Sequence, residues 1–215
     1  GMKLKQVGSV AIKLGIALAA LAGILIQAGA FSGRWRWSVF NYFTLVSNVL
    51  CVVYYGIAAS CATRGRASWQ PVLKGALVMG MTVTGLVYHV MLSGSFTMQG
   101  TMAVSDALLH TVVPLLTVLD WLIFEQKGRT TWKYPFAWVI LPDAYFVTSV
   151  VRVALGASLG YGGNRYPYPF LNADALGWGR VWLNVAVMHV FFILLGYLFV
   201  AIDKLMAQRV AQPRA

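Results

Sequence analysis

Long apolar runs separated by short polar loops dominate the chain. Six runs have about the 20 residues that a helix needs to cross a bilayer, and they lie near residues 7–30, 38–61, 71–94, 104–124, 134–156 and 178–203. The fifth is interrupted by Pro142 and Asp143. We therefore expect an all-α polytopic membrane protein: one bundle of six transmembrane helices over residues 1–215, with 157–177 as an outer-face loop.

The composition supports this class. The chain is 59% hydrophobic and 11% charged, with a mean hydropathy of +0.70, whereas soluble domains carry about 25% charged residues. The first run has an alternative interpretation as a signal peptide, because Lys3 and Lys5 precede it and it ends in "AGA" at 28–30. Its length favours a retained span.

The formal net charge of +11 is concentrated in alternate loops. One side of the predicted bundle receives Lys3, Lys5, Lys13, Arg64, Arg66, Lys74, Lys127, Arg129, Lys133, Lys204, Arg209 and Arg214. The other side holds Arg34, Arg36, Arg152, Arg165 and Arg180. Because positive residues collect on the cytoplasmic side, we expect both termini to be cytoplasmic. The basic residues do not form one face, so this charge does not indicate nucleic-acid binding.

A polar stripe interrupts the second predicted span. Asn41, Thr44, Ser47 and Asn48 recur at helical spacing within "WSVFNYFTLVSNVLC", residues 37–51. With the expected orientation, the rise of 1.5 Å per residue puts Thr44 roughly 10 Å below the outer interface. The fourth span enters from the same side and carries His110 to a similar depth. A hydroxyl and an imidazole from separate helices are therefore predicted to share one layer of the membrane.

This pair of groups suits acyl transfer, which uses an alcohol nucleophile and a base that takes its proton. Further polar residues of the outer half are candidates to support or orient the pair or to stabilise an oxyanion: Ser47, Asn48, His89, Asp106 and Arg152. Asp106 is well placed to orient His110, because residues four apart share a helix face.

Each candidate also has a purely structural interpretation. A threonine in a membrane helix commonly hydrogen-bonds its own backbone one turn earlier. Asp106 suits a helix cap, and Asn48 suits helix–helix packing. His189 fits either packing or a cavity wall. Asp120 and Trp121, near the inner end of the fourth span, fit anchors at the membrane interface.

The sequence predicts no cofactor. The three histidines lie on different predicted spans, and neither His-x₃-His nor Cys-x₂-Cys spacing occurs, so no metal motif is present. A haem held by two histidines between helices is the remaining possibility. Cys51 and Cys61 share one predicted helix about 15 Å apart, too far for a disulfide bond.

Three strings carry a resemblance to a known family. "NYFTLVSN" (41–48), "LLHTVVP" (108–114) and "YPYPFLNADALGWGR" (166–180) occur in this order among the six predicted spans. In these features the chain resembles the bacterial six-span Pr-six-Pr membrane proteins. It is more distantly similar to the animal androgen-induced-gene and androgen-dependent TFPI-regulating proteins. The resemblance covers nearly the whole chain.

The resemblance implies a function. The animal proteins are intramembrane threonine hydrolases that cleave fatty acid esters of hydroxy fatty acids with one threonine and one histidine. By resemblance, Thr44 is the nucleophile, His110 is the base, and Tyr168, Pro169 and Phe170 form a lid. A bacterial inner membrane and a lipid-like ester substrate are implied in the same way.

Some features stay open. Where Ser47 or Asn48 stands the animal proteins have an acid, and near Arg152 they have histidines, so the oxyanion partners and the preferred acyl chain are undetermined. The oligomeric state is open too, because small residues on the third span permit tight packing within or between subunits: Gly75, Gly80 and Gly85.

The sequence thus favours an intramembrane lipid ester hydrolase with Thr44 and His110 as its catalytic pair and membrane lipids as its surroundings. The alternative is a small transporter or channel that relays protons or anions through Asp143, His189 and Arg152. A third possibility is a binding or signalling protein in which the polar stripe only packs helices.

Overall fold

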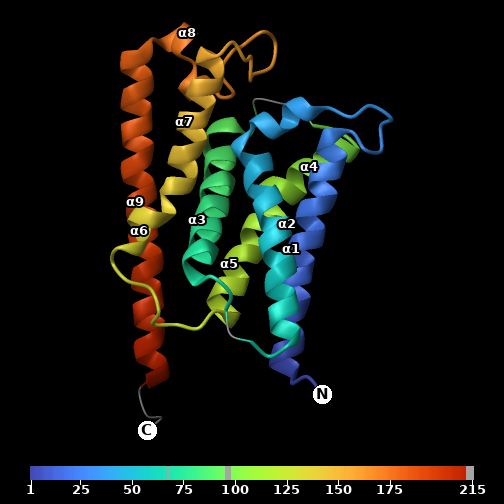
Figure 1. Cartoon of the computed structure of the whole chain (residues 1–215), viewed down its shortest axis with the longest axis vertical. Coiled ribbons are helices and arrows are strands. Elements are labelled where there is room, and N and C mark those ends of the chain that lie inside the picture. Colours follow the sequence, from blue (N-terminus) through green and yellow to red (C-terminus); the bar gives the residue numbers. More distant parts are fainter. Residues whose placement is uncertain (67, 95–97, 212–215) are drawn as a thin grey trace.

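Six membrane-length helices are the frame of the structure, a computed structural model that describes residues 1–66, 68–94 and 98–211 (Figure 1). Each is long and apolar enough to cross a membrane, which confirms the predicted all-α polytopic class. Their bounds are Leu4–Ala28, Phe43–Thr63, Pro71–Leu92, Thr101–Phe124, Tyr134–Ala154 and Trp178–Ala211. Arg214, counted above among the basic residues, lies outside the described residues.

Shorter elements subdivide these spans. The first two spans are α1 (Leu4–Ala28) and α2 (Phe43–Thr63), with the 3₁₀ helix η1 (Trp37–Asn41) between them. The third is α3 (Pro71–Val87) with η2 (Tyr88–Leu92), and the fourth is α4 (Thr101–Ala107), η3 (Leu108–Val112) and α5 (Val113–Phe124). The fifth is α6 (Tyr134–Trp138) with α7 (Ile140–Ala154), and the sixth is α9 (Trp178–Ala211).

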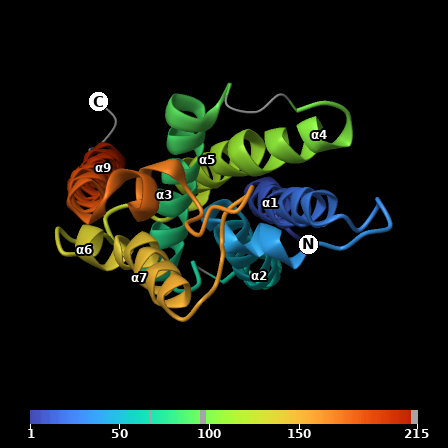
Figure 2. The same ribbon diagram turned by 90° about the horizontal axis from the view of Figure 1, so that it is seen from above.

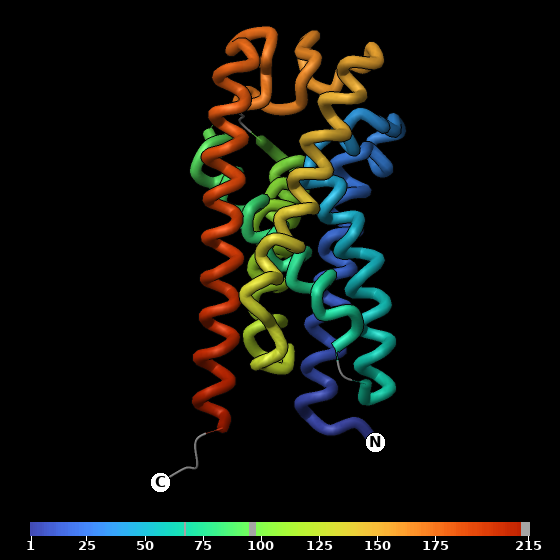
Figure 3. Tube along the Cα trace, turned by 60° about the vertical axis from the view of Figure 1, so that its left-hand side comes forward, coloured from blue at the N-terminus to red at the C-terminus, as the bar shows by residue number. Residues whose placement is uncertain are grey.

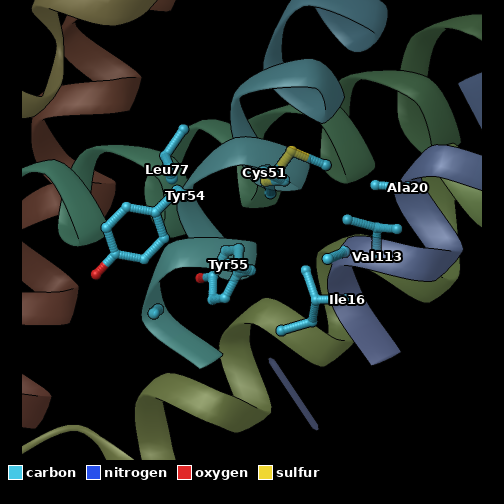
Figure 4. Packing of buried hydrophobic residues seen from close by; sticks show 10 residues of the cluster. Ile16, Ala20, Cys51, Tyr54, Tyr55, Leu77 and Val113 are labelled. Atoms are coloured by element: carbon cyan, nitrogen blue, oxygen red, sulfur yellow. The ribbon is translucent and has the colours of Figure 1, made fainter. Parts of the chain in front are cut away.

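The helices form one bundle with both termini at the same end (Figures 1 and 3). Seen from above, α1 and α2 lie side by side toward one edge and α9 lies at the opposite edge (Figure 2). We call the end that carries the termini the inner end, although its cytoplasmic location stays a prediction. The core between α1, α2, α3 and α5 is filled by Ile16, Ala20, Cys51, Tyr55, Leu77 and Val113 (Figure 4).

The fifth span breaks earlier than its proline suggested. The break lies at Val139, between α6 and α7, whereas Pro142 and Asp143 lie in the first turn of α7. Proline is tolerated there because its missing N–H has little to bond within the helix. Below the break, α6 packs against α9. Above it, α7 leans away from α9 toward the outer end (Figure 3).

The glycines of α3 face other helices of the same chain, so they permit close packing within the bundle. The groups that face them are Trp138 for Gly75, Leu141 for Gly80, and the His110 carbonyl oxygen for Gly85. A β-carbon at Gly85 would lie 3.3 Å from that oxygen, closer than ordinary contact. Glycine therefore lets α3 approach the fourth span at the residue that the sequence marked as a base.

The outer loop is an ordered cap. After α7 the chain turns back on itself, and Leu159 and Tyr166 are buried against Val153. It then forms η4 (Pro169–Leu171) and α8 (Ala173–Leu176) before α9 begins. The Tyr161 ring stacks on Tyr42, which immediately precedes α2, with 5.2 Å between ring centroids. The loop thus covers the outer end of α2.

A buried network of charges, not predicted from the sequence, joins three helices near the inner end. Asp120 of α5 has no exposed surface, and its carboxylate lies 2.8 Å from Lys13 Nζ of α1 and 2.6 Å from Lys74 Nζ of α3. Lys74 also lies 2.7 Å from Glu125. The interpretation of Asp120 and Trp121 as interfacial anchors was wrong, because both side chains are buried inside the bundle.

Loss of the shared carboxylate is expected to destabilise the bundle. Asp120→Ala leaves Lys13 and Lys74 buried without it, and removal of one partner of a buried ion pair costs about 3–5 kcal/mol. Denaturant titration in detergent micelles, followed by circular dichroism, measures the free energy of unfolding. Asp174→Ala removes the exposed partner of Arg165 in the outer loop and is the control, with no change expected. Equal stability of Asp120→Ala and the wild type would contradict a stabilising network.

Candidate functional site

The two residues that the sequence placed in one layer are in contact. Thr44 Oγ1 lies 3.3 Å from His110 Nε2, which joins the start of α2 to η3 across 66 positions of the chain. Thr44 is only 8% exposed. Because it is the second residue of α2, no carbonyl of the same helix lies one turn before it to accept its hydroxyl. The backbone-bonding interpretation of Thr44 is therefore wrong.

His110 is held from its other side by Asp106. The Nδ1 atom lies 3.2 Å from the Asp106 carbonyl oxygen and 3.0 Å from the carboxylate oxygen Oδ1. Both are acceptors, so Nδ1 carries the ring proton and Nε2 presents its lone pair to Thr44. Thr44, His110 and Asp106 thus form a chain in which a hydroxyl faces a base and the base is oriented by an acid.

Tyr88, which the sequence analysis missed, completes this chain. Its hydroxyl donates to Asp106 Oδ2 at 2.7 Å. Its ring stacks on the His110 ring with 3.9 Å between centroids and 13° between planes. The tyrosine therefore fixes both the carboxylate and the imidazole. The only signal for it was a tyrosine in the outer half of the third span, next to the candidate His89.

Two π-helical turns bring these groups together. η2 contains Tyr88 and η3 contains His110, and turns of this kind are rare and frequent at functional sites. In η3 the sequence supplies a reason, because Pro114 has no N–H to donate to the His110 carbonyl four residues earlier. His89 Nε2 and Thr111 Oγ1, 2.9 Å apart, join the two turns.

Ser47 and Asn48 support the backbone near Thr44. Asn48 is fully buried, and its amide donates to the Thr44 carbonyl at 2.7 Å and to the Leu109 carbonyl at 3.5 Å. It therefore ties α2 to the turn that carries His110. Ser47 donates to the Phe43 carbonyl at 2.7 Å, within its own helix. Neither Ser47 nor Asn48 lines a cavity that borders Thr44, so neither side chain is placed to contact a substrate.

Tyr168 of the outer loop reaches the first turn of α2. Its oxygen accepts the Phe43 N–H at 3.0 Å. The N–H of Thr44 belongs to the same turn, where N–H groups have no partner within the helix. Burial raises the pKa of Tyr168 to about 12, so its hydroxyl keeps a proton at neutral pH. Tyr168 is thus a hydrogen-bond donor beside Thr44, and Phe170 stacks on its ring at 5.2 Å.

Two cavities border Thr44. The larger, about 520 Å³, lies beneath the outer loop and is lined by both Asp106 and His110. The smaller, about 80 Å³, lies between α3, α7 and α9, and we call it the wedge cavity. The side chains that line both are Thr44, Tyr88, Leu92 and Tyr168.

His89 and Arg152 lie outside this site. Neither lines either cavity. His89 is exposed and bonds Thr111, while the Arg152 guanidinium donates to the Asn41 side chain at 3.1 Å. The structure therefore does not place them as oxyanion donors. In the π-helical turn the neighbouring Tyr88, not His89, stacks its ring on His110.

Asp143 and His189 form a separate pair on the wall of the wedge cavity. Asp143 Oδ1 lies 3.1 Å from His189 Nδ1, and the two side chains are 41% and 42% exposed. Arg152 bonds Asn41 instead, so the three residues of the predicted relay are not brought together. Within residues 1–66, 68–94 and 98–211, no group of three or more His, Cys, Asp or Glu side chains is arranged to hold a metal ion.

No protein-family model, no curated protein and no solved structure matches the chain.

Proposed function

We propose that this protein is an intramembrane lipid ester hydrolase in which Thr44 is the nucleophile and His110 the base. The observation that carries the proposal is the chain of contacts from Thr44 through His110 to Asp106, beginning at a threonine that two cavities border. A nucleophile beside a base that a third group orients is the arrangement of covalent hydrolysis. The 3.3 Å between Thr44 and His110 fits a site without substrate, where such contacts are often long.

The first half of the reaction forms an acyl-enzyme. Thr44 Oγ1 attacks the ester carbonyl carbon while His110 Nε2 takes the hydroxyl proton. The carbonyl π electrons move to the oxygen and give a tetrahedral oxyanion. When this intermediate collapses, the bond from carbon to the alcohol oxygen breaks, and His110 donates its proton to the departing alcohol. Asp106 stabilises the imidazolium that exists between the two proton transfers.

The start of α2 supplies groups for the oxyanion. The Tyr168 hydroxyl and the Thr44 N–H both lie at the first turn of this helix, whose N-terminus also carries the positive end of the helix dipole. Fixed donors aimed at a developing negative charge contribute strongly in a site that contains little water. Tyr168 thus has a catalytic role in the proposal, in addition to the lid role implied by the resemblance.

The second half of the reaction consumes water. His110 takes a proton from a water molecule, whose oxygen attacks the acyl-enzyme, and Thr44 leaves with the proton that His110 returns. The larger cavity offers the route for this water, because polar side chains line it beneath the outer loop: Gln27, Arg36, Asn164 and Asn172. The products are a carboxylic acid and the free enzyme.

The setting favours a lipid as substrate. The reacting groups lie within apolar helices of membrane length, so a fatty acid ester that enters sideways from the bilayer reaches Thr44 without crossing water. The strings that resemble the Pr-six-Pr and androgen-induced-gene proteins support fatty acid esters, with those of hydroxy fatty acids among them. The resemblance to the bacterial Pr-six-Pr proteins supports a bacterial inner membrane, and the positive charges support an orientation with the site in its outer half.

Hydrolysis and covalent labelling should depend on the same two residues. We expect the purified protein to release fatty acid from lipid esters and to react with a fluorophosphonate probe. Both activities should vanish in Thr44→Ala, which lacks the nucleophile. Both should fall by about a hundredfold or more in His110→Ala, because that variant lacks the base. Gel fluorescence measures labelling, and mass spectrometry of released fatty acids measures hydrolysis.

Matched variants separate catalysis from folding. Ser47→Ala removes a hydroxyl three residues from Thr44 that bonds its own helix, and Thr148→Ala removes an exposed hydroxyl of α7 that lines neither cavity. Both should keep labelling and hydrolysis near the wild-type level. A wild type that releases no fatty acid from any ester, or a Thr44→Ala variant that is as active as the wild type, contradicts the proposal.

Tyr168→Phe tests the oxyanion assignment. Loss of one oxyanion donor typically lowers kcat by about 10²-fold, and we expect that loss with little change in KM. The control is Tyr161→Phe, another tyrosine of the outer loop, which lines the larger cavity and stacks on Tyr42. A Tyr168→Phe variant with wild-type kcat would leave Tyr168 with a lid role only.

A further inference from the structure

The wedge cavity lies between α3, α7 and α9, and α7 leans away from α9 toward the outer end (Figure 3). Its walls are mostly apolar side chains of α3, α7 and α9: Val83, Val87, Phe146, Val185, Met188 and Phe192. Apolar clefts of this kind take hydrocarbon. Because Thr44 lies on its wall and its volume is about 80 Å³, the cavity is placed to hold the few carbon atoms nearest the ester in one of the two chains of a bound ester.

The direction of proton transfer determines whether the wedge cavity holds the acyl chain or the alcohol of the ester. In the proposed reaction, on which this inference rests, His110 donates its proton to the departing alcohol oxygen. His110 lines the larger cavity and not the wedge cavity. The alcohol must therefore lie on the side of the larger cavity, and the acyl chain on the side of the wedge cavity.

One polar side chain on the wall of the wedge cavity, Thr84, lacks a hydrogen-bond partner in the part of the chain that the structure describes. Thr84 is 4% exposed and lines the cavity, yet its hydroxyl oxygen has no hydrogen-bond partner among the described residues. Its neighbour Thr82 donates to the Val78 carbonyl at 2.8 Å, as helical threonines commonly do. A buried hydroxyl without a partner is costly. Rotation of the Thr84 side chain about its Cα–Cβ bond would turn this hydroxyl toward the cavity that the residue lines, where a ligand oxygen would satisfy it.

Asp143 and His189 present further polar atoms to the same space. Asp143 Oδ1 is engaged with His189 Nδ1, which leaves Asp143 Oδ2 and His189 Nε2 for a ligand. Plain hydrocarbon beside this pair would leave these two polar atoms without a hydrogen bond. The cavity is thus apolar along most of its walls but carries both donors and acceptors at one place.

Helix register puts Thr84 and Asp143 at a similar height. Gly80 of α3 faces Leu141 of α7, and both helices run toward the outer end from this contact. At 1.5 Å per residue, Thr84 lies about 6 Å and Asp143 about 3 Å above it. Thr84 and Asp143 both line the wedge cavity at this height, so a ligand oxygen in the cavity has both side chains in the surrounding wall.

We propose that the wedge cavity selects esters whose acyl chain carries a free hydroxyl group, bound between Thr84 and the Asp143–His189 pair. The hydroxyl donates to the Asp143 carboxylate and accepts from Thr84 or His189. This hydroxyl belongs to the acid that becomes attached to Thr44. It is distinct from the alcohol that the reaction releases.

The test compares methylumbelliferyl esters of stearic acid with those of its monohydroxylated isomers, with the hydroxyl at successive positions along the chain. We expect one isomer, or a few neighbouring isomers, to be cleaved with a kcat/KM about tenfold above that of the stearate ester. Thr84→Val and Asp143→Leu should abolish this preference and keep hydrolysis of the plain stearate ester. Thr82→Val, the matched control outside the cavity lining, should keep the preference.

A binding measurement separates this inference from the proposed hydrolysis. Thr44→Ala in lipid nanodiscs is titrated with radiolabelled hydroxystearic acid and stearic acid. Tighter binding of hydroxystearic acid that Thr84→Val abolishes supports the site even if no ester is hydrolysed. Hydrolysis that does not distinguish any hydroxylated isomer from stearate overturns the inference while the hydrolase stands. Equal binding of the two acids, together with no hydrolysis, overturns both.

Discussion

The contact between the Thr44 hydroxyl and the His110 ring is the interaction on which the rest of the site depends. Thr44 is the second residue of α2, so its hydroxyl has no acceptor in its own helix, and His110 lies in a π-helical turn of the fourth span. Asn48 ties the backbones of these two elements together, and Asp106 and Tyr88 hold the ring. Each contact limits where the imidazole can point. The result is a base aimed at a hydroxyl inside a layer of apolar helices.

The position of this contact also divides the space around it. The larger cavity lies beneath the outer loop on the His110 side, and the wedge cavity lies between α3, α7 and α9. The carbonyl carbon of an ester carries the acyl chain on one side and the alcohol on the other. Thr44 borders both cavities, so each cavity can take one side of the ester. The break at Val139 contributes to this shape, because α6 can pack on α9 while α7 leans away. Fold and proposed chemistry are therefore linked through one helix break.

The sequence was sufficient for the spans and for the proximity of Thr44 and His110, since hydropathy, charge and depth along each helix are local quantities. It was insufficient where geometry depends on an irregular turn or on a partner helix. His89 was a candidate because it is a polar residue of the outer half, but its neighbour Tyr88, in the π-helical turn Tyr88–Leu92, is the residue whose ring stacks on His110. Asp120 was interpreted as an interfacial anchor because its partners, Lys13 and Lys74, lie on other helices and their contact with it cannot be predicted from the local sequence. Similarly, the unpartnered hydroxyl of Thr84 is visible only once the other helices surround it.

The most direct measurement of the central claim is the detection of the acyl-enzyme itself. The protein in detergent micelles is mixed with a fatty acid ester, quenched in acid within the first turnover and digested for mass spectrometry. The proposed reaction predicts one added acyl group, located on the peptide that contains Thr44 and absent from the Thr44→Ala variant. Turnover without any acyl group on Thr44, or an acyl group on a different side chain, would contradict the assignment of Thr44 as the nucleophile.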